Sequence, residues 1–353
     1  MSVHIADREI ADYRDPYVIA EIGANHNGDM DLARRLILEA KNCGCDCVKF
    51  QSWTAETIFS AKNYRDNFFY KDDYRQRSDY TLQEIVDAFS LGEVQLAALK
   101  EYSDSLGLDF SSSVFSRREA DFLLDVLKCP FVKIASMDVT NLPFLEYVAS
   151  KGAPVVLSTG MSTVAEVDEA VRAMEQQGNR RIVLLHCVSN YPPVDEDIHL
   201  NNMLGLRAAY PDYPVGYSDH SLGSAVSIAS AALGACVIEK HFTLDRGMFG
   251  WDHAVSADPA EMRALVEGAR RAHKALGSTR RRLTEEDARR HPAYRRSIVA
   301  AREIPAGHRL AEEDLDFKRP GTGISPAEFR YVLGRTTAKP IAADEMLQWS
   351  DLL

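Results

Sequence analysis

The sequence lacks any hydrophobic run long enough to cross a membrane: no stretch approaches the roughly 18 consecutive apolar residues that a spanning helix requires. Its first ten residues are polar and do not include the apolar segment of a secretory signal. We therefore expect no membrane partner and a cytoplasmic location.

Positive charge is also scarce. The chain has 41 lysines and arginines against 52 aspartates and glutamates, which gives a formal net charge of −11. Such an excess of negative charge repels the phosphates of nucleic acids and anionic lipids, so we expect no nucleic-acid partner. An anionic substrate must then be attracted by a few lysines and arginines that are gathered in one place.

The six cysteines do not form paired spacings. Three of them alternate within residues 43–47, and the other three are scattered along the chain. These spacings match neither a zinc site nor a disulfide framework, so we expect reduced thiols in the core.

What the sequence does contain is a repeated unit. Between Tyr17 and Leu276, a short apolar run is followed eight times by a segment of helical periodicity. This pattern indicates parallel strands with crossover helices, and eight units favour closure into a (β/α)8 TIM barrel. The predicted strands are residues 17–22, 45–51, 109–113, 131–135, 154–158, 182–186, 214–218 and 236–241. The predicted helices are residues 30–42, 92–106, 118–127, 142–151, 164–177, 201–210, 222–233 and 259–276.

The composition changes after Leu276. Residues 277–293 are rich in charge, and we interpret them as a solvated linker, although their arginines could also contact anions. Residues 294–353 contain short apolar runs and turns, which predict a small second domain. A domain of this size has little stability of its own, so we expect it to dock on a barrel or on a second subunit. The predicted domains are therefore 1–276 (barrel), 277–293 (linker) and 294–353.

The connection between the second predicted strand and its helix is unusually long, from about residue 53 to 91. It contains six aromatic residues: Tyr64, Phe68, Phe69, Tyr70, Tyr74 and Tyr80. Long loops inside a compact domain are often functional, and this loop follows the carboxyl end of a strand. It is either a lid over the site or an excursion packed on the flank of the barrel.

Two of the predicted strands lead into His220 and His241. The carboxyl ends of barrel strands meet around one cavity, so both imidazoles could point into it. Such a pair suits a divalent metal ion that takes its remaining ligands from water or substrate. The alternative is two unrelated histidines that are satisfied by hydrogen bonds, and their positions at strand ends favour the metal.

The remaining strand ends also carry polar side chains. Lys49 and Lys133, with several hydroxyls, would suit a small phosphorylated anion, because ammonium groups neutralise its charge and hydroxyls bond its oxygens. Carboxylates remain for binding polyol hydroxyls or for moving protons. The polar residues at or just past the strand ends include Glu21, Asn25, His26, Gln51, Ser113, Ser136, Asp138, Ser158, His186, Ser189, Tyr191, Ser218, Glu239 and Asp252. Packing alone does not explain polar residues at all eight ends, so we predict an active site there.

At these residues the sequence resembles the sialic acid synthase family, the phosphoenolpyruvate-dependent nonulosonate synthases. The similar barrel segments are residues 20–28, 48–51, 131–136, 157–161, 184–187, 216–220 and 238–243, and residues 318–321 resemble the signature of the family's antifreeze-like (SAF) domain. The resemblance implies a transferase that forms a carbon–carbon bond. It would condense phosphoenolpyruvate with an N-acylated mannosamine-type aldehyde, with the assistance of a metal, to give a nonulosonic acid and phosphate.

The resemblance also implies roles for single residues. His220 and His241 would hold manganese or magnesium, and Glu21 would position water or move a proton. The residues that match phosphoenolpyruvate-binding positions are Lys49, Gln51, Ser113, Lys133, Ser136, Ser158 and Ser218. Those that match sugar-binding positions are Asp138, Tyr191, Asp252 and Arg319. Arg319 resembles an arginine that reaches into the barrel of a partner subunit, which implies a domain-swapped homodimer.

Several departures from the family pattern leave the acceptor sugar open. Asp138 stands where a glutamate is usual and Ser189 where an asparagine is common, and Trp251 and His253 lie beside the expected sugar site. A trideoxy diacetamido sugar, as used for legionaminate or pseudaminate, and another acylated hexose both remain candidates. Two other functions also remain: a different metal-dependent aldolase or isomerase on the same barrel, and a sugar-binding protein that uses its C-terminal domain.

Overall fold

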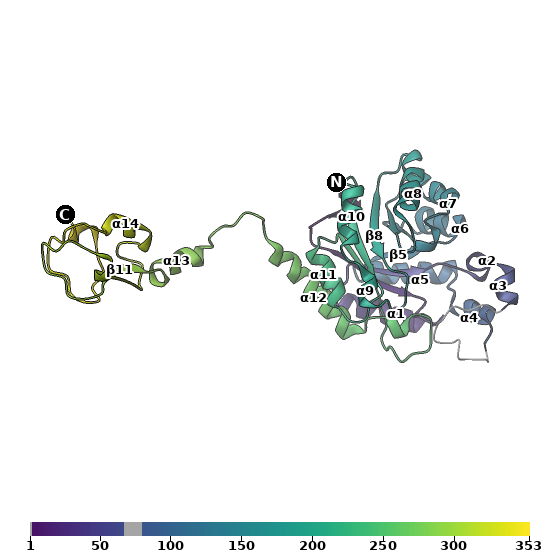
Figure 1. The fold of residues 1–353 in the computed structure, drawn as a ribbon. Coiled ribbons are helices and arrows are strands. Elements are labelled where there is room, and N and C mark those ends of the chain that lie inside the picture. The colour runs from purple at the N-terminus through teal and green to yellow at the C-terminus, as the bar shows by residue number, and fades with distance from the viewer. Residues whose placement is uncertain (1, 67–79) are drawn as a thin grey trace. The chain divides into compact units, whose positions relative to one another are not determined.

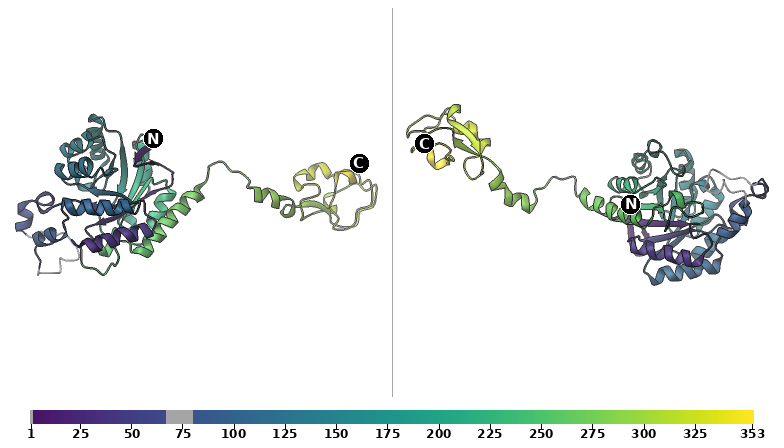
Figure 2. Two further views of the ribbon diagram at one scale, coloured as in Figure 1. Left: turned by 180° about the vertical axis from the view of Figure 1, so that it is seen from behind. Right: turned by 90° about the horizontal axis from the view of Figure 1, so that it is seen from below.

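The computed structural model describes residues 2–66 and 80–353. The chain divides into two compact units, Met1–Gly277 and Ser278–Leu353, and each has an apolar core of its own. The larger unit is a closed (β/α)8 barrel, shown in Figure 1 and from two further sides in Figure 2. The predicted fold is thereby confirmed.

Eight parallel strands close the barrel in the order β10-β3-β4-β5-β6-β7-β8-β9. They are buried almost throughout, which explains why they appear in the sequence as continuous apolar runs. All eight lie within two residues of the predicted bounds at either end. They are β3 (Tyr17–Gly23), β4 (Cys47–Gln51), β5 (Asp109–Ser113), β6 (Val132–Ile134), β7 (Val155–Ser158), β8 (Ile182–Cys187), β9 (Val215–Asp219) and β10 (Val237–His241).

Helices surround the barrel, and their buried faces pack on the outside of the strands. They are α1 (Met30–Asn42), α5 (Glu93–Ser105), α6 (Arg117–Asp121) continued by the π-helix η2 (Phe122–Val126), α7 (Leu142–Ser150), α8 (Val164–Gln176), α10 (Asn202–Ala209), α11 (Ala225–Ala232) and α12 (Pro259–Leu276). Short helices also follow three strand ends: η3 (Ser136–Asp138), α9 (Asp195–Ile198) and η4 (His253–Val255). No helix in the part of the chain that the structure describes has both the length and the apolarity to cross a bilayer.

The interior of the barrel is apolar near the starts of its strands. Tyr17, Phe131 and Val237 belong to this inner cluster, together with Val3 and Ile5 of an N-terminal hairpin. The hairpin, β1 (Ser2–Ile5) and β2 (Arg8–Ala11), was not predicted from the sequence. Because apolar side chains fill this end, the charged side chains of the interior gather at the carboxyl ends of the strands.

The long connection after β4 contains three helices in its described part, which the sequence did not predict: α2 (Ala55–Ile58), α3 (Ala61–Arg65) and α4 (Leu82–Phe89). Trp53 and Phe89 pack edge-on against Trp251, with ring centroids 5.1 and 6.2 Å away, and Tyr80 stacks on Phe249 at 6.0 Å. These contacts form one aromatic cluster with the loop that follows β10. Phe68, Phe69, Tyr70 and Tyr74, also assigned to a lid or excursion, lie outside the described residues.

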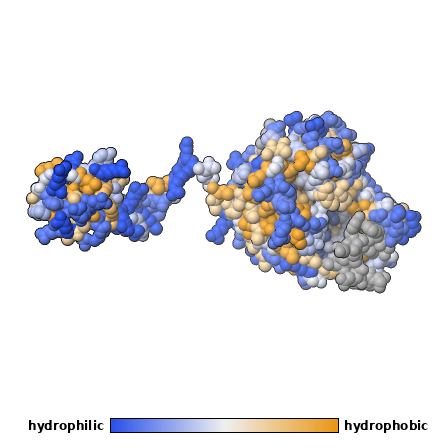
Figure 3. Space-filling model, in the orientation of Figure 1, coloured by the Kyte–Doolittle hydropathy of each residue, from blue (hydrophilic) through white to orange (hydrophobic). Residues whose placement is uncertain are grey.

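The smaller unit has a core of Ile298, Ile304, Leu315, Ile341 and their neighbours. Its elements are α13 (Glu285–Tyr294), the antiparallel pair β11 (Ser297–Ala300) and β12 (Leu315–Lys318), η5 (Glu312–Asp314), η6 (Pro326–Glu328), α14 (Phe329–Val332) and η7 (Trp349–Asp351). The segment that we expected to be a linker thus contains a helix. The chain just before α13 is largely hydrophilic, as the blue surface in Figure 3 shows.

Candidate active site

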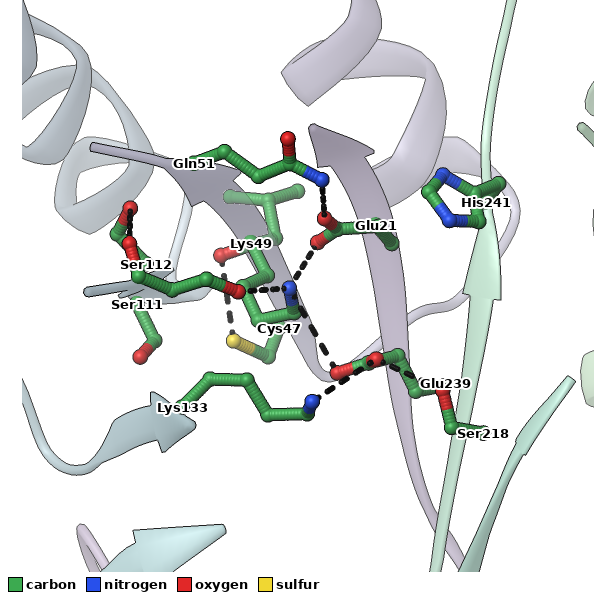
Figure 4. Close-up of polar contacts among 12 residues, drawn as sticks. Glu21, Cys47, Lys49, Gln51, Ser111, Ser112, Lys133, Ser218, Glu239 and His241 are labelled. Atoms are coloured by element: carbon green, nitrogen blue, oxygen red, sulfur yellow. Dashed lines mark hydrogen bonds and ion pairs between the residues drawn. The ribbon is translucent and has the colours of Figure 1, made fainter. Parts of the chain in front are cut away.

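Lys49 lies at the centre of a polar cluster inside the barrel (Figure 4). Its Nζ is 2.5 Å from Glu21 Oε2 and 3.8 Å from Glu239 Oε2. It also donates a hydrogen bond of 2.8 Å to Ser113 Oγ. These residues come from β3, β4, β5 and β10, and all of them are buried. Four strands that lie apart in the sequence therefore contribute to one site.

Glu239 links the two lysines. Its Oε1 lies 3.7 Å from Lys133 Nζ and accepts a hydrogen bond of 3.0 Å from Ser218 Oγ. Two buried lysines thus lie beside two buried glutamates. We predicted no role for Glu239. It lies two residues before His241 on the same strand, so both side chains point to the same face, and this spacing could have indicated that Glu239 belongs to the site.

The two carboxylates differ in their protonation. Burial raises the pKa of Glu21 to about 7, against the opposing influence of Lys49. Burial also favours the neutral form of Glu239, but Lys133 and Lys49 outweigh it and hold the pKa of Glu239 below its ordinary value. The site therefore holds one ionised carboxylate and one that can exchange a proton near neutral pH.

Further polar groups surround this cluster. Gln51 Nε2 donates to Glu21 Oε1 at 3.0 Å, and Ser136 Oγ accepts from the backbone N–H of Gly160 at 3.0 Å. Ser158 Oγ is buried without a hydrogen-bond partner. A buried hydroxyl without a partner is costly unless a ligand bonds it, so Ser158 is suited to receive one.

The predicted pair of imidazoles is present. The ring centroids of His220 and His241 are 5.4 Å apart, and both residues are buried. His220 Nδ1 lies 2.7 Å from the carbonyl oxygen of Val188. Because a carbonyl oxygen only accepts, Nδ1 carries the proton and the lone pair of a neutral His220 is on Nε2.

His241 also fits a metal. Its Nδ1 is buried without a hydrogen-bond partner, and burial lowers the pKa of His241 well below its ordinary value. The described residues include no group of three or more histidines, cysteines, aspartates or glutamates arranged to hold a metal. An ion at this pair would therefore take its remaining ligands from water or substrate, as in an open metal site.

Two of the predicted sugar-binding residues lie beside the histidines. The Tyr191 ring stacks on His220 with centroids 4.1 Å apart, and Asp252 Oδ2 is 3.7 Å from His241 Nδ1. Asp138 accepts a hydrogen bond from Asn141 within its own turn. The fourth residue, Arg319, belongs to the smaller unit and lies over the Tyr294 ring.

Three other polar residues at the strand ends hold loops in place. Asn25 donates to the Phe242 carbonyl at 2.9 Å, and His186 Nε2 lies 2.7 Å from the Ile198 carbonyl. His26 Nδ1 accepts from the backbone N–H of Gly28, and burial lowers the pKa of His26 to about 4. These residues support the rim of the barrel around the cluster.

Comparison with known proteins shows the family to which this chain belongs. The profile of the NeuB family matches residues 36–281, and the profile of the SAF domain matches residues 295–353. The chain belongs to the NeuB family. The predicted family resemblance and the predicted C-terminal SAF domain are thus confirmed.

Several known proteins are similar to this chain along almost their whole length. An uncharacterized protein of Methanocaldococcus jannaschii is 41% identical over 99% of this chain and 98% of its own. The N,N'-diacetyllegionaminic acid synthase of Legionella pneumophila is 39% identical over 95% of this chain and 94% of its own. The crystal structure of a sialic acid synthetase from Leptospira borgpetersenii superimposes on this chain with a TM-score of 0.71. The two sequences are 30% identical, and the match covers 82% of this chain and 94% of the synthetase chain. This NeuB-family chain is an enzyme of the synthase class.

Proposed function

We propose that this chain condenses phosphoenolpyruvate with the open-chain aldehyde of an N-acylated mannosamine-type sugar and forms a nonulosonic acid and phosphate. The observation that carries the proposal is the buried cluster of Lys49, Lys133, Glu21 and Glu239 beside two imidazoles. The similarity to a named diacetyllegionaminic acid synthase and to a named sialic acid synthetase supports it.

Phosphoenolpyruvate is a small trianion, and the cluster has the groups to bind it. Lys49 and Lys133 would neutralise its phosphate and carboxylate, and a buried site strengthens these attractions. The groups that would bond its oxygens are the hydroxyls of Ser113, Ser136, Ser158 and Ser218 and the amide of Gln51. The unpartnered hydroxyl of Ser158 favours this assignment.

In the reaction, carbon three of the enol attacks the aldehyde carbon and forms the new carbon–carbon bond. The aldehyde oxygen takes up a proton and becomes a hydroxyl. Water adds to carbon two, and phosphate leaves as the carbon–oxygen bond breaks. Glu21, which contacts Lys49 inside the cluster, would position that water or move its proton.

His220 and His241 would hold a divalent ion, manganese or magnesium. Such an ion supplies Lewis-acid polarisation of the aldehyde oxygen. The Nδ1 of His241, which has no hydrogen-bond partner, and the bond from His220 Nδ1 to the Val188 carbonyl, which orients that ring, support this pair as ligands.

The acceptor sugar would lie against Tyr191 and Asp252, and Asp138, in the turn after β6, would contact it from another part of the rim. Arg319 of the partner subunit would complete the site in a domain-swapped homodimer. The shorter side chain of Asp138 and the serine at position 189 leave a diacetamido sugar and another acylated hexose as candidate acceptors.

A coupled assay tests the proposal. We expect purified protein to release phosphate only when phosphoenolpyruvate and an acylated sugar are both present, and we expect a chelator to abolish the release. A panel of acylated hexoses, read by the mass of the product, then identifies the acceptor. Phosphate release from phosphoenolpyruvate alone would indicate a phosphatase instead.

The two other functions give different outcomes. A metal-dependent aldolase or isomerase would accept pyruvate or a ketose phosphate in place of phosphoenolpyruvate. A sugar-binding protein would bind its sugar without turnover, and binding would survive the combined substitutions His220→Ala and His241→Ala.

A further inference from the structure

A buried ion pair lies next in the chain to both histidines. Asp219 Oδ2 and Lys240 Nζ are 2.9 Å apart, and their side chains are 0% and 1% exposed. Asp219 precedes His220, Lys240 precedes His241, and the ion-paired residues face each other in the register of β9 and β10. One ion pair thus connects the two strand ends that carry the imidazoles.

The ion pair lies on the outer side of the barrel wall. Side chains alternate along a strand, and Ser218 and Glu239 bond to each other inside the barrel, so Asp219 and Lys240 point outward. Consistent with this, Ser227 of α11 donates a hydrogen bond to Asp219 Oδ2. Neither residue can touch a ligand in the cavity, so any effect on the site must act through the neighbouring residues of β9 and β10 that face the cavity, among them the two histidines.

Asp219 fixes the chain on both sides of His220. Its Oδ1 accepts from the backbone N–H of Ser221 at 2.8 Å, from Ser221 Oγ at 2.7 Å and from the Tyr217 hydroxyl at 3.2 Å. Lys240 Nζ donates to the carbonyl of Ser221 at 2.5 Å. The residues before and after His220 are therefore both bound to the neighbouring strand.

Stability does not explain this network. A buried ion pair loses about as much by desolvation as it gains by attraction, and apolar residues of similar volume often serve as well. The pair instead fixes the relative position of β9 and β10, because charged hydrogen bonds have a defined geometry. A site with two protein ligands depends strongly on that position, since no third protein ligand of the described residues corrects it.

We propose that Asp219 and Lys240 are positioning residues that set the separation of His220 and His241 for a divalent metal ion. This inference rests on the proposed function of the two histidines. It predicts a larger effect of the ion pair on metal affinity than on anion affinity, because both lysines of the anion site belong to β4 and β6 and only Ser218 of its serines lies on β9.

The test is direct binding of Mn²⁺ to the full-length, metal-stripped protein, measured from the electron paramagnetic resonance signal of free Mn²⁺. Asp219→Asn and Lys240→Met should each weaken Mn²⁺ binding by about tenfold or more, as is typical for residues that orient metal ligands. The affinity for phosphoenolpyruvate without metal, measured by calorimetry, should change far less than the Mn²⁺ affinity.

The combined Asp219→Asn and Lys240→Met variant separates position from stability. It leaves no unpaired buried charge, so its melting temperature should recover towards that of the unsubstituted protein. Its Mn²⁺ affinity should stay as weak as in the single variants. Recovery of both properties together would overturn the inference.

Asp12→Asn is the matched control. Asp12 accepts hydrogen bonds from Arg207 Nε at 2.7 Å and from the backbone N–H of Val215 at 2.8 Å, at the opposite end of β9. This variant should lose stability and keep its Mn²⁺ affinity. An equal loss of Mn²⁺ affinity in Asp12→Asn would show that general destabilisation is the cause and would overturn the inference.

Variants of the histidines distinguish a failure of the positioning role from a failure of the proposed metal site. If His220→Ala and His241→Ala abolish Mn²⁺ binding but the variants of Asp219 and Lys240 do not weaken it, only the positioning role fails. If Mn²⁺ binds equally well without both histidines, the proposed metal site fails, and the positioning role fails with it.

Discussion

At the scale of single residues, the two lysines of the site have different surroundings. Lys49 is held closely by Glu21 and Ser113, whereas the nearest carboxylate oxygen to Lys133 is 3.7 Å away. Burial lowers the pKa of Lys133, and Glu239 opposes that decrease. Lys133 is therefore the lysine with more capacity to bond an incoming anion.

Lys133→Ala should raise the KM for phosphoenolpyruvate roughly tenfold or more, since a hydrogen bond to a charged group is worth about 1.5–3 kcal/mol. The KM for the sugar should change far less. Steady-state kinetics with each substrate varied in turn measures both. Lys151→Ala, which removes a lysine paired with Asp121 and Asp125 on the surface, is the control, and equal losses for both substrates would contradict the assignment.

Ser158→Ala should leave the melting temperature unchanged, because Ser158 Oγ has no hydrogen bond to lose. It should weaken phosphoenolpyruvate binding by roughly fivefold, the value of about 1 kcal/mol for one neutral hydrogen bond. Calorimetry gives both quantities. Ser111→Ala is the control. It removes a buried hydrogen bond of 2.8 Å from Ser111 Oγ to the Phe131 carbonyl, so it should lower the melting temperature.

At the scale of elements, the barrel strands could be predicted closely. Buried parallel strands are apolar on both faces, so a run such as residues 154–158 stands out without an alignment. The same logic predicted which residues meet, because strand ends of a barrel surround one cavity. His220 and His241, and Glu21 and Lys49, lie together for this reason.

Short elements escaped prediction for a physical reason. Strands β1 and β2 have four residues each, too few for a clear pattern, and they depend on tertiary contacts such as those of Val3, Ile5 and Ile10 with the barrel interior. The π-helix η2 likewise has no distinct signal in the local sequence. Side-chain pairing was also out of reach, since the contact of Glu239 with both lysines depends on rotamers that no sequence pattern specifies.

The turn η5 of the smaller unit gives a prediction on pH. Asp314 accepts hydrogen bonds from the backbone N–H of Ala311 at 2.8 Å and from His308 Nε2 at 2.7 Å, and it pairs with Arg302. Burial would raise its pKa, but these bonds outweigh burial and lower the pKa of Asp314.

A lowered pKa in the folded state means that the unfolded chain binds the proton more readily. The stabilisation by Asp314 is therefore complete above the unfolded pKa of about 3.9 and is lost as the pH falls through the lower folded value. Hydrogen exchange of the smaller unit within the full chain should show acid-induced opening. In the Asp314→Asn variant, the smaller unit should open already at neutral pH, and its hydrogen exchange should depend less on acid. Identical exchange profiles of the variant and the unsubstituted protein would refute this role of Asp314.

At the scale of the whole molecule, the proposed homodimer makes Arg319 part of a site on another chain. Arg319→Ala should lower activity although the residue lies in the smaller unit. Unchanged kinetics would exclude the smaller unit from catalysis.

Mixing two impaired variants tests the exchange itself. Lys49→Ala inactivates the barrel and keeps Arg319, whereas Arg319→Ala keeps an intact barrel. If the arginine is exchanged between subunits, dimers refolded from a mixture should regain activity, because one intact barrel then meets one intact Arg319. If each chain uses its own arginine, the mixture should stay inactive.

The most direct measurement for the central claim follows the bridging oxygen of phosphoenolpyruvate, labelled with oxygen-18, by mass spectrometry of the products. Condensation at this site breaks the carbon–oxygen bond, so the label should appear in the released phosphate, together with an unlabelled nonulosonic acid. Labelled pyruvate, with no label in the phosphate and no sugar acid, would contradict the account.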